Sequence, residues 1–292
     1  MSKKFSPRIN RFQAIAFAIL VSAGLASIGA AATLLFSTGN PDGQIATLSR
    51  IGTATQIQTE TADDFVLTGN TIIEQATFTG LIPTGAALSS ITRVEIEIYN
   101  VFPLDSTNPP SGKVPTRVNS PADVEIDEAT SDSADSTLMF TSTLLSPNFS
   151  VANSVVTGIN PIPNQTTGGE GPVTGQEVQI TVIFNPAITL PAGHYFFRPA
   201  VQLSSGDFLW LSASNPIVSP GTPFSPDLQT WIRNDNLAPD WLRIGTDIIG
   251  AGVFNASFSL FGEADQDDDG VPDSEDQCPD TAAGADPRRS CR

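Results

Sequence analysis

Strict alternation runs through Val178-Gln179-Ile180-Thr181-Val182-Ile183-Phe184, where every even-numbered residue is apolar. Because successive side chains of a β-strand point to opposite faces, this period of two predicts a strand with one buried face. The same pattern recurs outward along the chain, in residues 71–81, 94–99, 195–203 and 254–260, and in shorter runs at 64–67, 138–145 and 207–213. We therefore expect eight or nine strands and an all-β protein.

The segments between these runs are typical of turns and long loops. The chain contains 23 glycines and 23 prolines in 292 residues, many of them clustered between the alternating segments. One short helix is expected over residues 227–233, because Pro226 precedes it and proline is favoured at a helix start. Two-sided strands joined by long loops predict that residues 33–262 form one antiparallel β-sandwich, jelly-roll-like in topology.

The charge of the chain limits its partners. Lys and Arg total 14 against 31 Asp and Glu, giving a formal net charge of −17 at pH 7. Such a chain has too few cations to neutralise a run of phosphates, so nucleic acid and anionic lipid are disfavoured as partners. Charged residues are nevertheless only 15% of the chain and hydrophobic residues 40%, so most of the length can bury a core.

The N-terminus has the pattern of an export signal. Residues 1–11 are basic, residues 14–32 are uncharged and mostly small or apolar, and Ala30-Ala31-Ala32 precedes Thr33. This combination predicts a signal peptide over residues 1–32, with a membrane anchor that is not cleaved as the alternative. After cleavage the chain has no further stretch of spanning length, and we expect it to be secreted or held at the cell surface.

Residues 263–292 differ from the body, because acids dominate and apolar residues almost vanish. Residues 265–276 fill a twelve-residue calcium loop, with acids at positions 1, 3, 5, 9 and 12 and Gly270 at the turn position. A plain acidic tail would not require this glycine or this alternate spacing. The expected Ca²⁺ ligands are the side chains of Asp265, Asp267, Asp269, Asp273 and Asp276 and the backbone carbonyl of Val271.

Continuing through Gln277-Cys278-Pro279-Asp280-Thr281, this segment resembles a thrombospondin type 3 repeat. The resemblance covers roughly 20 residues and matches the family's pattern D-x-D-x-D-G-x-x-D-x-x-D-x-C-P. It implies calcium-dependent ordering of residues 263–292 in an extracellular or surface protein. Such repeats normally occur in tandem, whereas here a single repeat is followed by Cys291. Cys278 and Cys291 are the only cysteines, so we expect a disulfide between them in an oxidising compartment.

Three short motifs of the body carry a second, looser resemblance. Residues 61–67, 192–197 and 208–213 are similar, in sequence and order, to parts of jelly-roll-like domains in secreted bacterial surface proteins. The resemblance extends over about residues 36–262. It implies a fold and an extracytoplasmic location but no activity.

The tryptophans suggest two different roles. Trp210 lies between Leu209 and Leu211 in an alternating run and is expected in the core. A polar loop region holds the candidate ligand-binding residues, which are Trp231, Arg233, Asn234, Asp235 and Trp241. Aromatic faces beside such polar groups suit a sugar-binding platform. The alternative is that both loop tryptophans pin a long loop to the sandwich.

Catalytic patterns are weak in this sequence. His194, the only histidine, lies in a predicted strand and is expected to be a structural or exposed residue. Paired carboxylates for glycoside cleavage require only a suitable separation in space, and the candidates are Asp63, Asp64, Asp207 and Asp240. We therefore predict no catalytic residue with a sequence signature.

Together these patterns predict an exported, acidic surface protein of the binding or adhesion type, with Ca²⁺ bound at its C-terminal repeat. The expected partner is a polysaccharide or a component of the cell envelope, and we do not expect an enzyme. Two alternatives remain open. One is a polysaccharide-cleaving hydrolase or lyase that uses carboxylates on the sandwich face, and the other is a purely structural surface or matrix protein.

Overall fold

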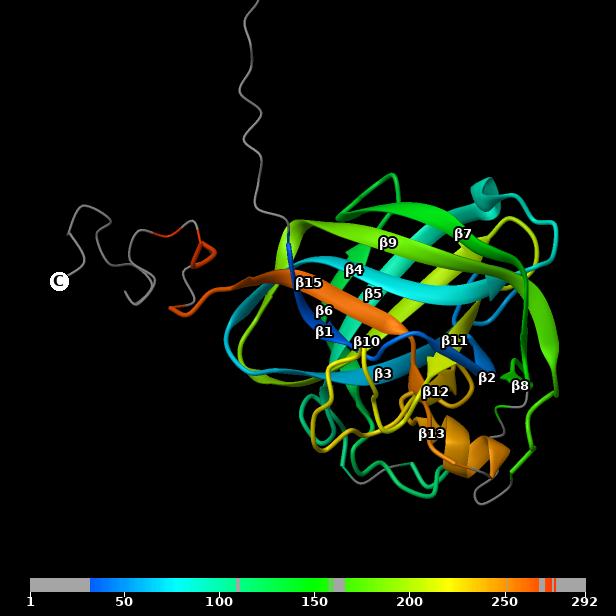
Figure 1. Ribbon diagram of the computed structural model, residues 1–292. Coiled ribbons are helices and arrows are strands. Elements are labelled where there is room, and N and C mark those ends of the chain that lie inside the picture. Colours follow the sequence, from blue (N-terminus) through cyan, green and yellow to red (C-terminus); the bar gives the residue numbers. More distant parts are fainter. Residues whose placement is uncertain are drawn as a thin grey trace, which may run out of the picture. The chain divides into compact units, whose positions relative to one another are not determined.

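In a computed structural model of the protein, the described residues form fifteen strands in two sheets (Figure 1). The structure describes residues 32–108, 111–157, 159, 166–250, 252–267, 271–274 and 276. The predicted signal peptide, apart from Ala32, therefore lies outside the described residues, as do Asp269 and both cysteines. The predicted all-β sandwich is confirmed.

The larger sheet has nine strands, and its centre is the long strand β4. One edge of β4 pairs with β9, which in turn pairs with β7, while its other edge is shared by β15 and β11. These strands are β1 (Thr33–Ser37), β2 (Pro41–Leu48), β4 (Thr71–Ile82), β7 (Leu138–Val151), β8 (Asn153–Val155), β9 (Val173–Leu190), β11 (Leu209–Ala213), β14 (Asn255–Ala256) and β15 (Phe258–Ala264). The β2–β8 pair is parallel, so this sheet is mixed rather than wholly antiparallel as predicted.

The smaller sheet has six strands in the order β13-β12-β3-β10-β5-β6, all antiparallel. They are β3 (Thr59–Leu67), β5 (Ile91–Val101), β6 (Pro121–Thr130), β10 (Gly193–Leu203), β12 (Trp231–Asn234) and β13 (Leu242–Arg243). Two short helical turns complete the described elements, a 3-10 turn at Leu88–Ser90 and a π-helical turn at Ile244–Ile249.

The predicted helix over residues 227–233 is wrong. Residues 227–230 are extended coil and Trp231 begins strand β12, which pairs with β3 through Trp231 and Ala62. Leu228 and Thr230 donate tertiary hydrogen bonds to buried aspartates of β3, and these bonds outweigh the local helix-start signal.

The main core lies between the two sheets and is rich in aromatic rings. Phe197 and Phe258 stack at 4.9 Å between ring centroids, and Trp210 packs edge-on against both. Trp210 is fully buried, as predicted, and its indole N–H donates to the carbonyl of Ser257 at 2.9 Å. Gly80 packs so closely against this core that a Cβ there would lie 2.2 Å from the ring of Phe208.

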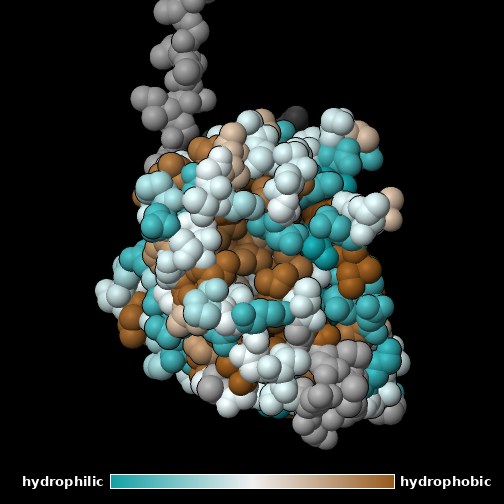
Figure 2. All heavy atoms as spheres, turned by 90° about the vertical axis from the view of Figure 1, so that its right-hand side faces the viewer, coloured by the Kyte–Doolittle hydropathy of each residue, from teal (hydrophilic) through white to brown (hydrophobic). Residues whose placement is uncertain are grey.

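Apolar side chains also gather on the outer faces of both sheets. A cluster from β2, β4, β7 and β11 lies on the larger sheet and includes Ala46, Leu48, Leu81, Val151, Leu209 and Leu211. Figure 2 views the side where β2, β8 and the ends of β7 and β9 lie, and shows apolar residues in a hollowed centre with polar residues around it. The outer face of the smaller sheet carries a second cluster of Ala62, Tyr99, Ala122, Phe196, Trp231 and Trp241. The candidate site is built beside this second cluster.

Among the described residues, no helix is both long and apolar enough to cross a membrane.

Candidate functional site

The site begins with an extended segment, residues 227–231, that leads into strand β12. Two adjacent buried aspartates of β3 hold its even-numbered residues. Asp64 Oδ2 accepts the N–H of Leu228 at 3.1 Å, and Asp63 Oδ1 accepts the hydroxyl of Thr230 at 3.0 Å. These two hydrogen bonds hold the segment against β3 and so position the residues of the segment that line the pocket described next.

Four residues of this segment, Asp227, Leu228, Gln229 and Trp231, line a pocket of about 410 Å³. Its walls come from the loop between β5 and β6, from the segment before β12, and from β12 and β13, with the lining residues Thr116, Val118, Asn119, Pro226, Asp227, Leu228, Gln229, Trp231 and Arg243. A volume of this size lies in the range of small-molecule sites, about 300–1,000 Å³. The pocket is therefore large enough to hold a small ligand.

Three polar atoms of the lining residues lack a partner among the described residues. Asp227 Oδ1, Gln229 Oε1 and the indole nitrogen of Trp231 are each buried without a hydrogen bond. Buried polar atoms are nearly always paired, since leaving one unpaired costs about 1–3 kcal/mol. All three atoms belong to residues of the pocket wall, so a small shift of these side chains would bring two acceptors and one donor to a ligand or to water in the pocket.

The other oxygen of Asp227 is held within the protein. It accepts the N–H of Ile217 and the side-chain amide of Asn255, each at 3.2 Å. Burial raises the pKa of Asp227, despite these hydrogen bonds. The lining guanidinium of Arg243 is also engaged, because it binds Asp247 at 2.6 Å. The pocket thus combines a fixed carboxylate with a cation whose charge is already balanced.

Burial also raises the pKa values of the two anchoring aspartates. The shift is large for Asp63, whose carboxylate is completely buried and lies next to the charge of Asp64. Burial raises the pKa of Asp64 against the opposing hydrogen bond from His194, whose Nε2 lies 2.6 Å from Asp64 Oδ2. His194 is part-exposed and also packs edge-on against Phe224, so it supports the Asp64 anchor.

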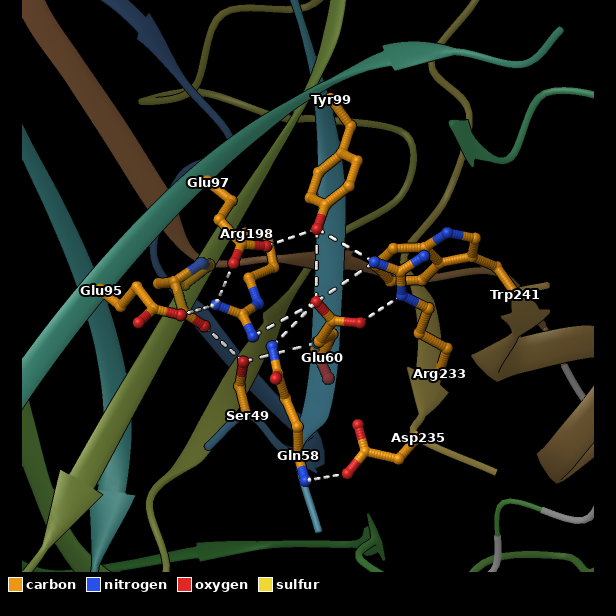
Figure 3. A network of polar contacts seen from close by, with 12 residues as sticks. Ser49, Gln58, Glu60, Glu95, Glu97, Tyr99, Arg198, Arg233, Asp235 and Trp241 are labelled. Atoms are coloured by element: carbon orange, nitrogen blue, oxygen red, sulfur yellow. Dashed lines mark hydrogen bonds and ion pairs between the residues drawn. The ribbon is translucent and has the colours of Figure 1, made fainter. Parts of the chain in front are cut away.

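A second polar assembly lies on the outer face of the smaller sheet (Figure 3). Arg198 of β10 is fully buried and forms ion pairs with Glu95 at 2.8 Å, Glu97 at 3.2 Å and Glu60 at 3.3 Å. The hydroxyl of Tyr99 donates to Glu97 and lies 3.3 Å from Glu60. We call these five residues, together with Arg233, the arginine–glutamate network.

Arg233 connects this network to the tryptophan cluster. Its guanidinium binds Glu60 through two nitrogens and lies 4.3 Å above the ring of Trp241. A cation over an aromatic face is attracted by the ring quadrupole, which adds to the ion pair. Strands β3, β5, β10 and β12 are thus joined by charge across the sheet.

The carboxylates of the network differ in their acidity. Burial raises the pKa of Glu97 to about 7, and the charge of Arg198 only partly opposes this rise. Burial would also raise the pKa of Glu60, but the charges of Arg198 and Arg233 outweigh it and the pKa is lowered. Both carboxylates accept from Tyr99, so their nearest oxygens are at most about 6 Å apart. An acid and an ionised carboxylate at this separation form the kind of pair that glycosidases use.

The predicted sugar platform is wrong as a stacking surface. Trp231 and Trp241 are 1% and 0% exposed, so neither ring face is open to a ligand. The alternative reading, that they pin the loop region to the sandwich, agrees with this burial. Of the predicted ligand-binding residues, only Trp231 lines the pocket, and Arg233 is buried in the network.

The two remaining residues of the predicted set shape the turn after β12. Asn234 accepts the N–H groups of Asn236 and Leu237 through its side-chain oxygen, at 3.1 and 3.2 Å. Asp235 accepts the N–H of Gln58 at 2.9 Å. Both side chains therefore hold backbone in place rather than facing the pocket.

The four carboxylates proposed for catalysis are not one cluster. Asp63 and Asp64 are the anchors described above. Asp207 pairs with Arg50 at 2.8 Å, and Asp240 is fully buried beside Arg117 at 3.4 Å. No described contact joins Asp207 or Asp240 to the β3 pair, and each has a structural partner of its own.

The predicted calcium loop is described only in part. Position 9 of the loop lies against its start, because Asp273 donates its N–H to the carbonyl of Ala264 at 2.9 Å and accepts the N–H of Gln266 at 2.8 Å. Asp265 is fully buried, and Asp267 and Asp276 each bury a carboxylate oxygen. The described residues hold no group of three or more acidic, histidine or cysteine side chains that could bind a metal, and Asp269 lies outside them.

Comparisons with protein-family models, with curated proteins and with solved structures give no match. The candidate site therefore rests on this chain's own geometry. Sequence reasoning did not find the pocket or the arginine–glutamate network. One sequence signal for the network was available, because charged residues interrupt two apolar strands at Glu95, Glu97 and Arg198. A charge on a covered face of a sheet requires a partner of opposite charge, so these residues could have been expected to pair.

Proposed function

We propose that this chain is an exported surface-binding protein, and that the pocket lined by Asp227, Gln229 and Trp231 binds a neutral carbohydrate. The observation that carries the proposal is that three residues lining one pocket each bury a polar atom without a partner among the described residues. A sugar hydroxyl both donates and accepts, so one class of ligand can satisfy two acceptors and a donor.

Charge favours a neutral ligand over an anionic one. The chain carries a net charge of −17, and Asp227 contributes a carboxylate to the pocket wall. The lining cation, Arg243, is already balanced by Asp247. An acidic ligand would therefore meet repulsion without a free cation to offset it.

The test is binding of the chain to a panel of neutral, acidic and amino sugars and to insoluble polysaccharides, measured by calorimetry and by pull-down. Gln229→Leu removes the acceptor and approximately keeps the volume, and we expect it to abolish binding. The matched control is Gln75→Leu, at a half-buried position in β4 of the other sheet. Equal binding by the Gln229 variant, or no neutral sugar bound by the parent chain, contradicts the proposal.

We also propose that residues 265–276 bind Ca²⁺ and thereby order the C-terminal segment. The support is the ligand spacing of the loop and the hydrogen bond by which Asp273, at position 9, lies against Ala264 just before the loop. Ca²⁺ should protect the segment from protease, and Asp269→Ala should remove this protection. Asp268→Ala is the matched control, because position 4 of the loop supplies no ligand. Protection that survives in the Asp269 variant contradicts the assignment.

A second candidate function is polysaccharide hydrolysis by the arginine–glutamate network. The observation in its favour is Glu97, with a pKa of about 7, beside an ionised Glu60. Against it, the two carboxylates are 7% and 6% exposed and are already bound by Arg198, Arg233 and Tyr99. Release of reducing ends from a polysaccharide by the parent chain, lost in both Glu97→Gln and Glu60→Gln, would establish this function.

A further inference from the structure

Strand β7 forms a long outer edge of the larger sheet (Figure 1). It has 14 residues, and within the described chain it pairs only with β9. The backbone groups on the far side of an edge strand can pair with another chain, which makes such an edge either a hazard or an interface. The part before the bulge at Leu145 and the following Pro147 is the regular stretch, residues 138–144.

The composition of this edge differs from that of the long edge of the other sheet. Strand β6, the outer strand of the smaller sheet, carries Asp123, Glu125, Asp127 and Glu128. Strand β7 carries no charged residue over its whole length. Charges on an edge strand are a common protection against strand pairing, so β6 has this protection and β7 lacks it.

Three apolar residues of β7, Met139, Leu144 and Leu145, are exposed, whereas Leu138 and Phe140 pack in the main core. Met139 is 61% exposed and Leu145 48%, and Met139 pairs with Ile183 of β9, which is itself 46% exposed. In a chain with a net charge of −17, copies repel one another over most of their surface. The uncharged strip along β7 is a surface on which two copies can approach without that repulsion.

The sequence of the edge is complementary to itself. Successive residues of a strand direct their backbone N–H and C=O groups to opposite edges of the strand. In an antiparallel pair, two residues that face each other direct these groups both toward or both away from the partner strand. When the two strands are copies related by a two-fold axis, the numbers of the facing residues therefore differ by an even number. With the axis at Ser142, Thr141 faces Thr143 and Phe140 faces Leu144 within the regular stretch. Hydroxyl thus meets hydroxyl and apolar meets apolar. With the axis at Thr141, Met139 would face Thr143 and Phe140 would face Ser142.

We propose that two copies of this chain associate through β7, in an antiparallel pairing centred on Ser142 that joins their larger sheets. Pairs of aromatic or aliphatic residues and of threonines directly opposite each other each stabilise such a ladder. Because both copies use the same edge, the association closes at a dimer and does not propagate. The proposal is independent of the pocket, which lies beside the other sheet.

The test is the oligomeric state of the chain, purified from an exporting host, by sedimentation velocity over a wide concentration range. We expect a species of twice the chain mass. Thr143→Lys should give a monomer, because it puts a charge into the edge, and Thr143 is exposed enough for the fold to tolerate it. Thr143→Val is the matched control and should keep the dimer.

A double variant tests the register. In the proposed pairing, Thr141→Lys with Thr143→Glu places each new lysine opposite a glutamate of the other copy, so this variant should recover the dimer that Thr141→Lys alone loses. A parent chain that stays monomeric, a Thr143→Lys variant that still dimerises, or a double variant that stays monomeric overturns the proposal. Circular dichroism of each variant shows that the fold is retained.

Discussion

Replacing Glu97 by glutamine should change how the stability of the fold depends on pH. Burial raises the pKa of Glu97 from 4.5 to about 7, so the folded state binds this proton more tightly than the unfolded chain does. A carboxyl whose folded pKa is raised loses stability as pH rises from its unfolded to its folded pKa. Glutamine has nearly the same shape and no proton to release, so the variant lacks this loss.

The size of the effect follows from the shift. A difference of one pKa unit corresponds to about 1.4 kcal/mol, so the rise from 4.5 to about 7 corresponds to about 3 kcal/mol. Between pH 4.5 and 8, the stability of Glu97→Gln relative to the parent should therefore rise by about 3 kcal/mol. Glu60, whose lowered pKa has the opposite effect on stability, is present in both proteins and largely cancels in the comparison.

The assay is urea denaturation of both proteins at a series of pH values, with ΔG of unfolding taken by linear extrapolation. The control is Glu125→Gln, which removes an exposed carboxylate from the neighbouring strand β6. A stability difference between Glu97→Gln and the parent that stays constant with pH would refute the reasoning. An equal pH-dependent change in the Glu125 variant would assign the effect to net charge instead.

Three further substitutions test other parts of the structure. Arg198→Met should destabilise the fold by about 3–5 kcal/mol at pH 7, because it leaves three buried carboxylates without their shared cation. Part of this loss should be recovered at pH 5, and urea titrations at both pH values measure the difference. Trp241→Ala should cost about 3–5 kcal/mol by leaving a cavity on the smaller sheet, measured by thermal or urea unfolding, and a cost below 1 kcal/mol would contradict its role in pinning the loop. Gly80→Ala should lower the stability by about 1–3 kcal/mol, because the new methyl group meets the buried ring of Phe208, whereas a variant with unchanged midpoint would show that this contact relaxes freely.

Much of the fold could be predicted from alternation. Strands β4, β5, β9 and β10 were found because alternate residues of each pack in the main core, which gives a period of two. Strand β2 escaped because its pattern is irregular and only residues 45–48 are buried. Strand β6 was missed although residues 122–127 alternate between apolar and acidic. In this edge strand Val124 and Ile126 are 53% and 39% exposed, so its alternation does not mark a core face.

The candidate site was much harder to predict. The pocket is assembled from loops and strand ends that are distant in sequence, and its anchor residues Asp63 and Asp64 look like any acidic pair at a strand. Trp231 and Trp241 were singled out from the sequence, but composition alone does not tell an exposed sugar-binding surface from buried side chains that hold a loop on the sandwich. The two cases differ in whether other parts of the chain cover the tryptophan rings, which depends on the tertiary structure.

The pairing of β1 with β15 has a consequence for how the protein is made. Thr33 lies opposite Gly262, so the first strand finds its partner only when nearly the entire body has been synthesised. Contacts between such distant parts of a chain form slowly, since a long loop must close first. If the chain is exported N-terminus first, β1 leaves the channel well before β15, and the larger sheet is completed only when β15 follows. The topology itself therefore delays completion of the fold until the last strand of the body is available.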